Sequence, residues 1–288
     1  MMKADLTPAT PFFNVDRVPL YADHNGSKLL LQKEALVNHD TGVVYGVVSP
    51  KYKLVENDKI ADIFTEAFKN HPVESINDHV NNDGGKWKRD IVFGGKYQKE
   101  VKVGDVVSTK ITLHNSYDGL ASVGFDFGTM RLVCTNGMKS YHKDYSVTFK
   151  HVVHDIVEKI RKIFEMKFED FSTQFEMFKK LTQVNFTEKQ FMDFVRANIK
   201  EDRELEEHEQ RGVLSERQAS KIIELYPQVR QRYNDHEDTV WSHLNVLTAI
   251  QTHHTKAHNG SNVFSAGYRN MQTLIDRFNK QTQYALAA

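Results

Sequence analysis

The spacing of hydrophobic and polar residues changes near residue 150. Before that point, short apolar or alternating runs are separated by glycine-containing turns, which is typical of β-strands. After it, glycine becomes sparse and apolar residues recur every three or four positions, which is typical of α-helices. The pattern predicts an α+β protein, in which an N-terminal antiparallel β-meander with one inserted helix (residues 1–150) is followed by a mostly helical half (residues 151–288). The two halves are expected to be either separate domains or one continuous domain.

The strand-rich half is expected to begin with a hairpin and a helix. Residues 29–36 and 43–48 flank a turn in which Gly42 supplies a positive φ. Asn57 is a good N-cap for a helix that ends at His71-Pro72, because the residue before a proline is pushed out of the helical region. Turns that contain glycine then separate the remaining predicted strands. These strands are residues 86–93, 97–103, 106–113, 121–127 and 131–135, and residues 145–149 are expected to add one more.

An apolar stripe runs from Val153 to Phe178 at steps of three or four residues. It predicts one long helix, or two helices with a break near Ser172. Such a stripe either faces the chain's own core or forms the interface of a homo-oligomer. Both alternatives remain open from the sequence.

The rest of the helical half has clear helix starts. Thr187 with Gln190, and Ser215 with Gln218, each match a capping box. Residues 200–212 are too charged to bury a face, so a solvated helix or a mobile link is expected there. Residues 239–255 and 264–281 are predicted as two amphipathic helices.

Composition limits the class of protein. The 288 residues carry 38 basic and 38 acidic side chains, which argues against a surface that binds nucleic acid everywhere but allows a local basic groove. Cys134 is the single cysteine, which excludes a disulfide framework and a thiolate metal site and fits a buried core residue. No apolar run of signal-peptide or membrane-spanning length occurs. We expect a cytoplasmic protein without a cofactor, in the host cytoplasm if a phage encodes it.

The segment 84–102, read as a hairpin, combines basic and aromatic residues. Cations neutralise phosphates while aromatic faces stack on bases, as in proteins that bind single-stranded nucleic acid. The alternative is an ordinary solvated hairpin, in which strict alternation places Trp87 in the core. The predicted nucleic-acid-binding residues are Lys86, Trp87, Lys88, Arg89, Lys96, Tyr97 and Lys99, together with Arg131.

Two polar clusters are candidate chemical sites. His114, Asn115 and Asp118 lie in a predicted turn, where His114 and Asp118 have the residue types of a base and the group that orients it. No nucleophile motif or phosphate loop accompanies them, so a structural turn is the alternative. His254 and His258 have the spacing of zinc ligands on a helix, but Asn259-Gly260 interrupts it, and no metal site is expected. No catalytic residue is assigned, and an enzyme is the less favoured interpretation.

Several segments occur in the order seen in one known family. They are the run 40–52 around YGVVSPKY, the turn 114–119 (HNSYDG), the run 131–138 (RLVCTNGM) and a late stretch with Trp241, Asn245, Thr248 and residues 252–254. From about residue 28 onward, the chain resembles a family of phage- and plasmid-borne proteins catalogued as a domain of unknown function. The resemblance implies a mobile-element origin and a housekeeping or recombination role, and it carries no activity with it.

The order of strand, strand, helix, meander and long helix also resembles that of single-strand annealing proteins of the RecT and Red-beta kind, which oligomerise and have a basic groove. The leading hypothesis is therefore a phage or plasmid DNA-metabolism protein that binds single-stranded DNA and, in its stronger form, anneals it. One alternative is a protein–protein module that modulates a host enzyme. The other is an unrecognised enzyme centred on His114, Asp118 and Arg131. The expected partners are single-stranded DNA, a host protein, or a second copy of the chain through the helix at 153–178, and no membrane.

Overall fold

The computed structural model describes residues 10–81, 84–132, 139–151, 155, 158–159, 172–200, 212–254 and 266–287. Cys134, His258, residues 201–211 and most of the predicted helix at 153–171 lie outside these ranges. Contacts divide the chain into two compact units that alternate along the sequence. Unit 1 comprises Met1–Gly95, Thr109–Gly128 and Lys143–Glu169, and unit 2 comprises Lys96–Ser108, Thr129–His142 and Asp170–Ala288. The predicted α+β class, with the strands before the helical half, is confirmed.

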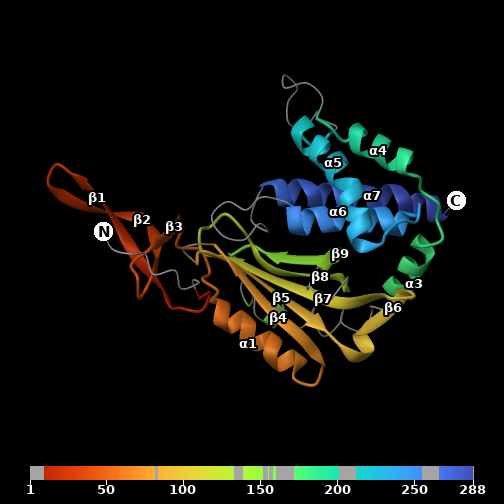
Figure 1. Cartoon of the computed structure of the whole chain (residues 1–288). Coiled ribbons are helices and arrows are strands. Elements are labelled where there is room, and N and C mark those ends of the chain that lie inside the picture. Colours follow the sequence, from red (N-terminus) through yellow and green to blue (C-terminus); the bar gives the residue numbers. More distant parts are fainter. Residues whose placement is uncertain are drawn as a thin grey trace, which may run out of the picture. The chain divides into compact units, whose positions relative to one another are not determined.

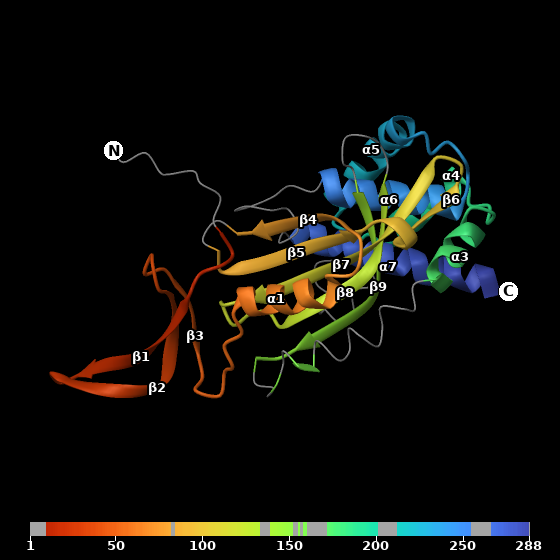
Figure 2. The same cartoon turned by 90° about the horizontal axis from the view of Figure 1, so that it is seen from below.

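A three-stranded antiparallel sheet opens unit 1. Its strands are β1 (Val15–His24), β2 (Ser27–Asn38) and β3 (Val44–Val48), in that order. The predicted hairpin between β2 and β3 is confirmed, and Gly42 has a φ of 71°. β1 was not predicted. It joins β2 through Asn25-Gly26, both with positive φ, as a two-residue hairpin turn requires. In Figures 1 and 2 the β1–β2 hairpin extends beyond β3.

A second antiparallel sheet has the order β4-β5-β7-β8-β9, with β6 also paired to β7. Its strands are β4 (Val73–Val80), β5 (Lys86–Phe93), β6 (Gln98–Lys102), β7 (Asp105–Ser116), β8 (Val123–Leu132) and β9 (Lys139–Phe149). The predicted hairpin of residues 84–102 is wrong: β5 and β6 follow one another along β7 instead of pairing with each other. β4 was missed, and the two strands predicted on either side of Gly128 are the single strand β8.

Helix α1 (Asn57–Phe68) packs on one face of this sheet within unit 1. Its aromatic residues contact β5 and β8, with ring centroids 4.6 Å apart for Phe68 and Phe93 and 5.8 Å apart for Phe64 and Phe125. Because side chains alternate along a strand, the neighbours of these apolar residues point to the other face. In unit 1 the other face is polar.

Five described helices form most of unit 2. They are α3 (Ser172–Leu181), α4 (Glu188–Ala197), α5 (Glu216–Tyr233), α6 (Val240–His254) and α7 (Ala266–Ala287). Both predicted capping boxes are present at the starts of α4 and α5. Phe175 and Phe178, the end of the apolar stripe, lie in the core of unit 2. The predicted break near Ser172 borders residues outside the described ranges and stays a prediction. Among the described residues, no helix is both long and apolar enough to cross a membrane.

Candidate functional site

Several of the predicted phosphate contacts are occupied by acidic side chains. In unit 1, Lys86 lies 3.0 Å from Asp118, and the guanidinium of Arg89 binds both carboxylate oxygens of Asp78 at 2.9 Å. A cation with a carboxylate partner has less charge to offer a phosphate. Lys86 and Arg89 are therefore weaker candidates for phosphate contacts than the sequence suggests.

Trp87 is fully buried in unit 1. Its indole Nε1 donates a hydrogen bond to Asp78 at 2.7 Å, and its ring meets the ring of Phe12 edge-on at 5.9 Å. A base cannot stack on a ring that has no exposed face. The alternative that places Trp87 in the core describes this residue correctly.

A different set of lysines is exposed in unit 2. Lys96 lies in the 3-10 turn before β6 and Lys99 lies in β6, and α3 packs next to that strand, as Figure 2 shows. The ammonium of Lys99 lies 5.1 Å from the ring centroid of Phe175 in α3, which joins the two elements. Tyr97 is half-buried between the two lysines, with the Lys96 ammonium 5.1 Å from its ring centroid.

Lys179 and Lys180, in the last turn of α3, are exposed as well. We call the exposed lysines of these two neighbouring parts of the chain the basic edge: Lys96, Lys99, Lys179 and Lys180. Lys96, Lys99 and Lys180 form no ion pair with any residue that the structure describes, and Lys179 has only a 3.5 Å contact with Glu176. Against four lysines stand Glu176 and Glu100, so the surface is locally positive although the whole chain is neutral. The sequence could not place α3 beside β6, and only Lys96, Tyr97 and Lys99 of this surface were predicted.

In unit 1, the turn predicted as a polar site has a structural role. Asn115 donates hydrogen bonds of 2.8 Å to Val55 O and to the side chain of Asn57 at the start of α1. The hydroxyl of Tyr117 accepts from the backbone N–H of Asn57 at 2.9 Å. Burial alone would raise the pKa of Asp118, but hydrogen bonds from Ser116 and the backbone of Leu120, with the Lys86 ammonium, lower it instead. These contacts are those of a structural turn that ties β7 to α1.

The polar face of the sheet in unit 1 contains a cluster that sequence reasoning missed. Asp90 lies 2.8 Å from the Lys110 ammonium and 3.2 Å from His79, and it accepts a 2.7 Å hydrogen bond from Thr112. Burial raises the pKa of Asp90, but Lys110 and His79 outweigh it and lower the pKa overall. Lys88 and His114 are cross-strand neighbours on the same face. The alternation of side chains along β5 and β7 could have indicated this cluster, but only if the pairing of the two strands had been known.

Arg131 lies in unit 2 and is buried between two carboxylates. It donates to Asp105, and its two terminal nitrogens donate to Asp235 at 2.6 and 3.0 Å. The indole N–H of Trp241 donates to the second oxygen of Asp105 at 2.7 Å. Burial raises the pKa of Asp235 despite the nearby guanidinium. The guanidinium of Arg131 therefore already donates to two carboxylates and does not reach a phosphate.

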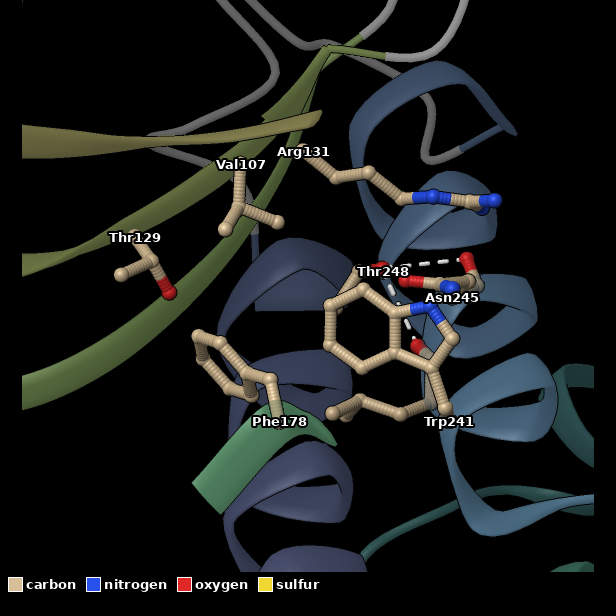
Figure 3. A pocket seen from close by; sticks show the side chains of 8 residues that line it. Val107, Thr129, Arg131, Phe178, Trp241, Asn245 and Thr248 are labelled. Carbon is tan, nitrogen blue, oxygen red and sulfur yellow. Dashed lines mark hydrogen bonds between the residues drawn. The ribbon is translucent and has the colours of Figure 1, made fainter. Parts of the chain in front are cut away.

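A small cavity adjoins Arg131 and Trp241 (Figure 3). The centre of a water molecule can occupy about 10 Å³ of this cavity, which is enough room for about one water. Asn245 lines it, is almost fully buried, and has an amide nitrogen without a hydrogen-bond partner among the described residues. Thr248, also on the wall, donates to the carbonyls of Leu244 and Asn245. The cavity suits a bound water that accepts from Asn245.

Comparison with known proteins identifies the family of this chain but does not indicate a function. The family model described as "Domain of unknown function (DUF932)" matches residues 44–282, most of the chain. The chain belongs to the DUF932 family. No curated protein matches this DUF932 chain. No solved structure matches it either.

Two of the four segments that carry the resemblance contribute to the cavity wall. Arg131 begins the run RLVCTNGM, whose residues 133–138 lie outside the described ranges, while Trp241, Asn245 and Thr248 come from the late stretch. The family match begins at β3, so β1 and β2 precede it.

The residues of the predicted enzyme centre are divided between the two units of the DUF932 chain. His114 and Asp118 belong to unit 1, whereas Arg131 belongs to unit 2 and is bound by two carboxylates of that unit. No group of three or more metal-ligating side chains occurs among the residues described. His254 lies at the end of α6, and its predicted partner His258 is outside the described ranges.

Proposed function

We propose that this protein binds single-stranded DNA at the basic edge of unit 2, as a phage or plasmid DNA-metabolism protein. The observation that supports the proposal is the exposure of Lys96, Lys99 and Lys180 without a carboxylate partner among the described residues. Lys86, Arg89 and Arg131, in contrast, are already paired with acids. Binding is therefore assigned to a smaller set of residues than the sequence suggested.

The basic edge has the two components that single-strand binding needs. Its lysines can neutralise phosphates and release condensed counterions, which favours binding at low salt. Tyr97 offers a partly exposed ring on which a base can stack once Lys96 moves to a phosphate, and stacking on an aromatic ring is tolerant of sequence. The surface consists of a strand beside a helix, an arrangement along which an extended nucleic-acid strand can lie.

The test is the binding of a fluorescently labelled oligo-dT, followed by anisotropy over a salt series. Four neutralised phosphates predict a slope of log K against log salt of about −3, because each contributes about −0.7 on a single strand. The double variant Lys96→Gln/Lys99→Gln should flatten the slope by roughly 1.4, since two of these contacts are lost. Its affinity at low salt should fall accordingly.

The matched control is Lys189→Gln/Lys280→Gln. It removes two exposed lysines of unit 2 that lie on α4 and α7 and do not belong to the basic edge. Binding should be nearly unchanged in this variant. No binding by the wild type at low salt, or equal losses in both variants, would exclude the proposed site. Modulation of a host enzyme would then be the hypothesis to pursue, by a pull-down for a protein partner.

A further inference from the structure

Three side chains form a row across the polar face of the second sheet in unit 1. Strand register places His79 of β4 opposite Lys88 of β5, and Lys88 opposite His114 of β7. Residues that lie directly opposite on neighbouring strands project from the same face, with Cβ atoms about 4.5–5.5 Å apart. We call His79, Lys88 and His114 the polar row. All three residues are half-buried, and 30% of the His79 side chain is exposed.

The imidazole of His79 is held by a carboxylate. Its Nε2 lies 3.2 Å from Asp90, whose side chain is 18% exposed. The same carboxylate is held by the Lys110 ammonium at 2.8 Å and by the Thr112 hydroxyl at 2.7 Å. When Nε2 of His79 carries the proton that Asp90 accepts, Nδ1 holds the lone pair and can take a proton from a substrate. A carboxylate that orients an imidazole in this way is a common part of general-base catalysis.

The imidazole of His114 lies at the other end of the row. A Cβ atom at Gly124 of β8 would be 3.1 Å from Nε2 of His114 and would collide with the backbone carbonyl of Val147 in β9. Gly124 therefore leaves room for the His114 ring to lie against β8. The backbones of the two histidines are two strand spacings apart, which is about 10 Å. A phosphate group over Lys88 lies between the two imidazoles.

The residue types of the polar row fit one class of reaction. Two imidazoles can take a proton from one atom and give a proton to another, while an ammonium between them stabilises negative charge. The three residues include no hydroxyl or thiol that could attack a phosphate, so the row suits a substrate that carries its own nucleophile. In RNA the ribose 2′-hydroxyl lies next to the phosphodiester, whereas DNA lacks this group.

We propose that the polar row cleaves single-stranded RNA by transesterification within the RNA chain. His79 takes the proton of the 2′-hydroxyl, and the 2′-oxygen forms a bond to the adjacent phosphorus. The bond from this phosphorus to the 5′-oxygen of the next nucleotide breaks, and protonated His114 gives that oxygen a proton. The products are a 2′,3′-cyclic phosphate and a free 5′-hydroxyl. Lys88 stabilises the negative charge on the phosphate oxygens in the transition state, and proton exchange with water restores both histidines.

The test is the cleavage of a fluorescently labelled uridine oligonucleotide by the full chain, in buffer that contains EDTA. Denaturing electrophoresis separates the products, and mass spectrometry identifies the 2′,3′-cyclic phosphate. The RNA should be cut, and a DNA oligonucleotide of the same length should stay intact. His79→Gln and His114→Gln should each slow cleavage about 100-fold or more, since a general acid or base contributes at least this much. Circular dichroism confirms that each variant is folded.

The matched control is His39→Gln. His39 also lies in unit 1 and pairs with a carboxylate, that of Asp16 at 2.8 Å, but it is exposed and lies outside the polar row. This variant should cleave RNA like the wild type. All the proteins are purified in the same way, so a contaminating ribonuclease would give equal cleavage in every preparation.

Asp90 acts through His79 and is a positioning residue. Asp90→Asn removes the charge that holds the imidazole but leaves Lys88 and His114 in place to bind the phosphate. It should lower kcat and leave KM within about twofold of the wild type, because the interaction that it removes acts in the transition state.

Three results would overturn the proposal. A wild type that does not cleave the RNA excludes the activity. Equal cleavage of RNA and DNA excludes the 2′-hydroxyl as the nucleophile. Cleavage by His79→Gln and His114→Gln at the rate of His39→Gln excludes the polar row as the site. The two histidines lie on different strands, so one variant still decides the question if the other does not fold. None of these results depends on DNA binding at the basic edge.

Discussion

Cationic side chains occur in two different environments in unit 2, and the sequence does not distinguish them. Arg131 is almost fully buried between Asp105 and Asp235, and all its donors that the structure describes point at carboxylates. The lysines of the basic edge are exposed, and three of the four form no ion pair with a described residue. The ion pairs of Arg131 stabilise the fold, whereas the lysines of the basic edge remain available to bind a ligand.

The energetics of the two arrangements differ as much as their geometry. A buried ion pair is costly to break, because the partner left behind is a desolvated charge without compensation. An exposed lysine gains little from its surroundings and costs little to remove. Mutations in the two regions should therefore separate stability from ligand binding.

The largest effect is expected for Arg131→Met. Methionine fills part of the volume of the arginine stem but leaves Asp105 and Asp235 buried beside each other without a cation. Removal of one partner from a buried pair typically costs about 3–5 kcal/mol of the free energy of unfolding. Urea unfolding followed by circular dichroism measures this loss.

The control for this prediction is Arg196→Met on α4. Arg196 forms an exposed contact of 3.5 Å with Asp193, and surface pairs of this type contribute at most about 1 kcal/mol. A similar loss of stability in Arg131→Met and Arg196→Met would contradict the distinction between buried and exposed cations.

The fold was predictable where one local rule decides the structure. The capping boxes at Thr187 and Ser215 fix the starts of α4 and α5, because side chain and backbone satisfy each other over three residues. β1 and β4 were missed because edge strands are largely exposed on both faces and lack a clear hydrophobic alternation. The pairing of β5 and β6 with β7 was missed because alternation does not reveal a strand's neighbour.

The site was less predictable than the fold. Alternation along β5 correctly offered the buried alternative for Trp87. The contact of Arg131 with Asp235 spans 104 positions, so no local pattern could indicate that this cation is neutralised. The packing of α3 on β6, which adds Lys179 and Lys180 to the basic edge, is likewise a tertiary contact.

A smaller effect on stability is expected from the protonation of His243. This histidine is buried in unit 2, stacked on Phe191 with ring centroids 4.9 Å apart, and its Nε2 donates to Phe186 O. Burial lowers its pKa to about 4 from the usual 6.5. As the pH falls from 6.5 to 4, the unfolded chain takes up a proton that the folded protein does not. This should cost about 3 kcal/mol of stability by pH 4.

The pH dependence of urea unfolding tests this expectation. His243→Gln keeps an amide that can donate to Phe186 O but has no group that titrates in this range. It should be less stable than the wild type at pH 7 and lose less stability between pH 6.5 and 4. Parallel curves for the two proteins would show that His243 is not the group responsible.

The smallest effect on stability is expected for Lys96→Gln/Lys99→Gln. Both side chains are exposed, and the substitution weakens the contacts of Lys96 with the Tyr97 ring and of Lys99 with the Phe175 ring. The free energy of unfolding should change by less than about 0.5–1 kcal/mol, as is usual for exposed cation–π contacts and surface substitutions. Urea unfolding of the same preparation used for DNA titration measures this change. If the variant loses DNA binding and retains its stability, the basic edge is a ligand surface. A loss of stability comparable to that of Arg131→Met would instead make Lys96 and Lys99 structural residues and remove the contrast between the two regions.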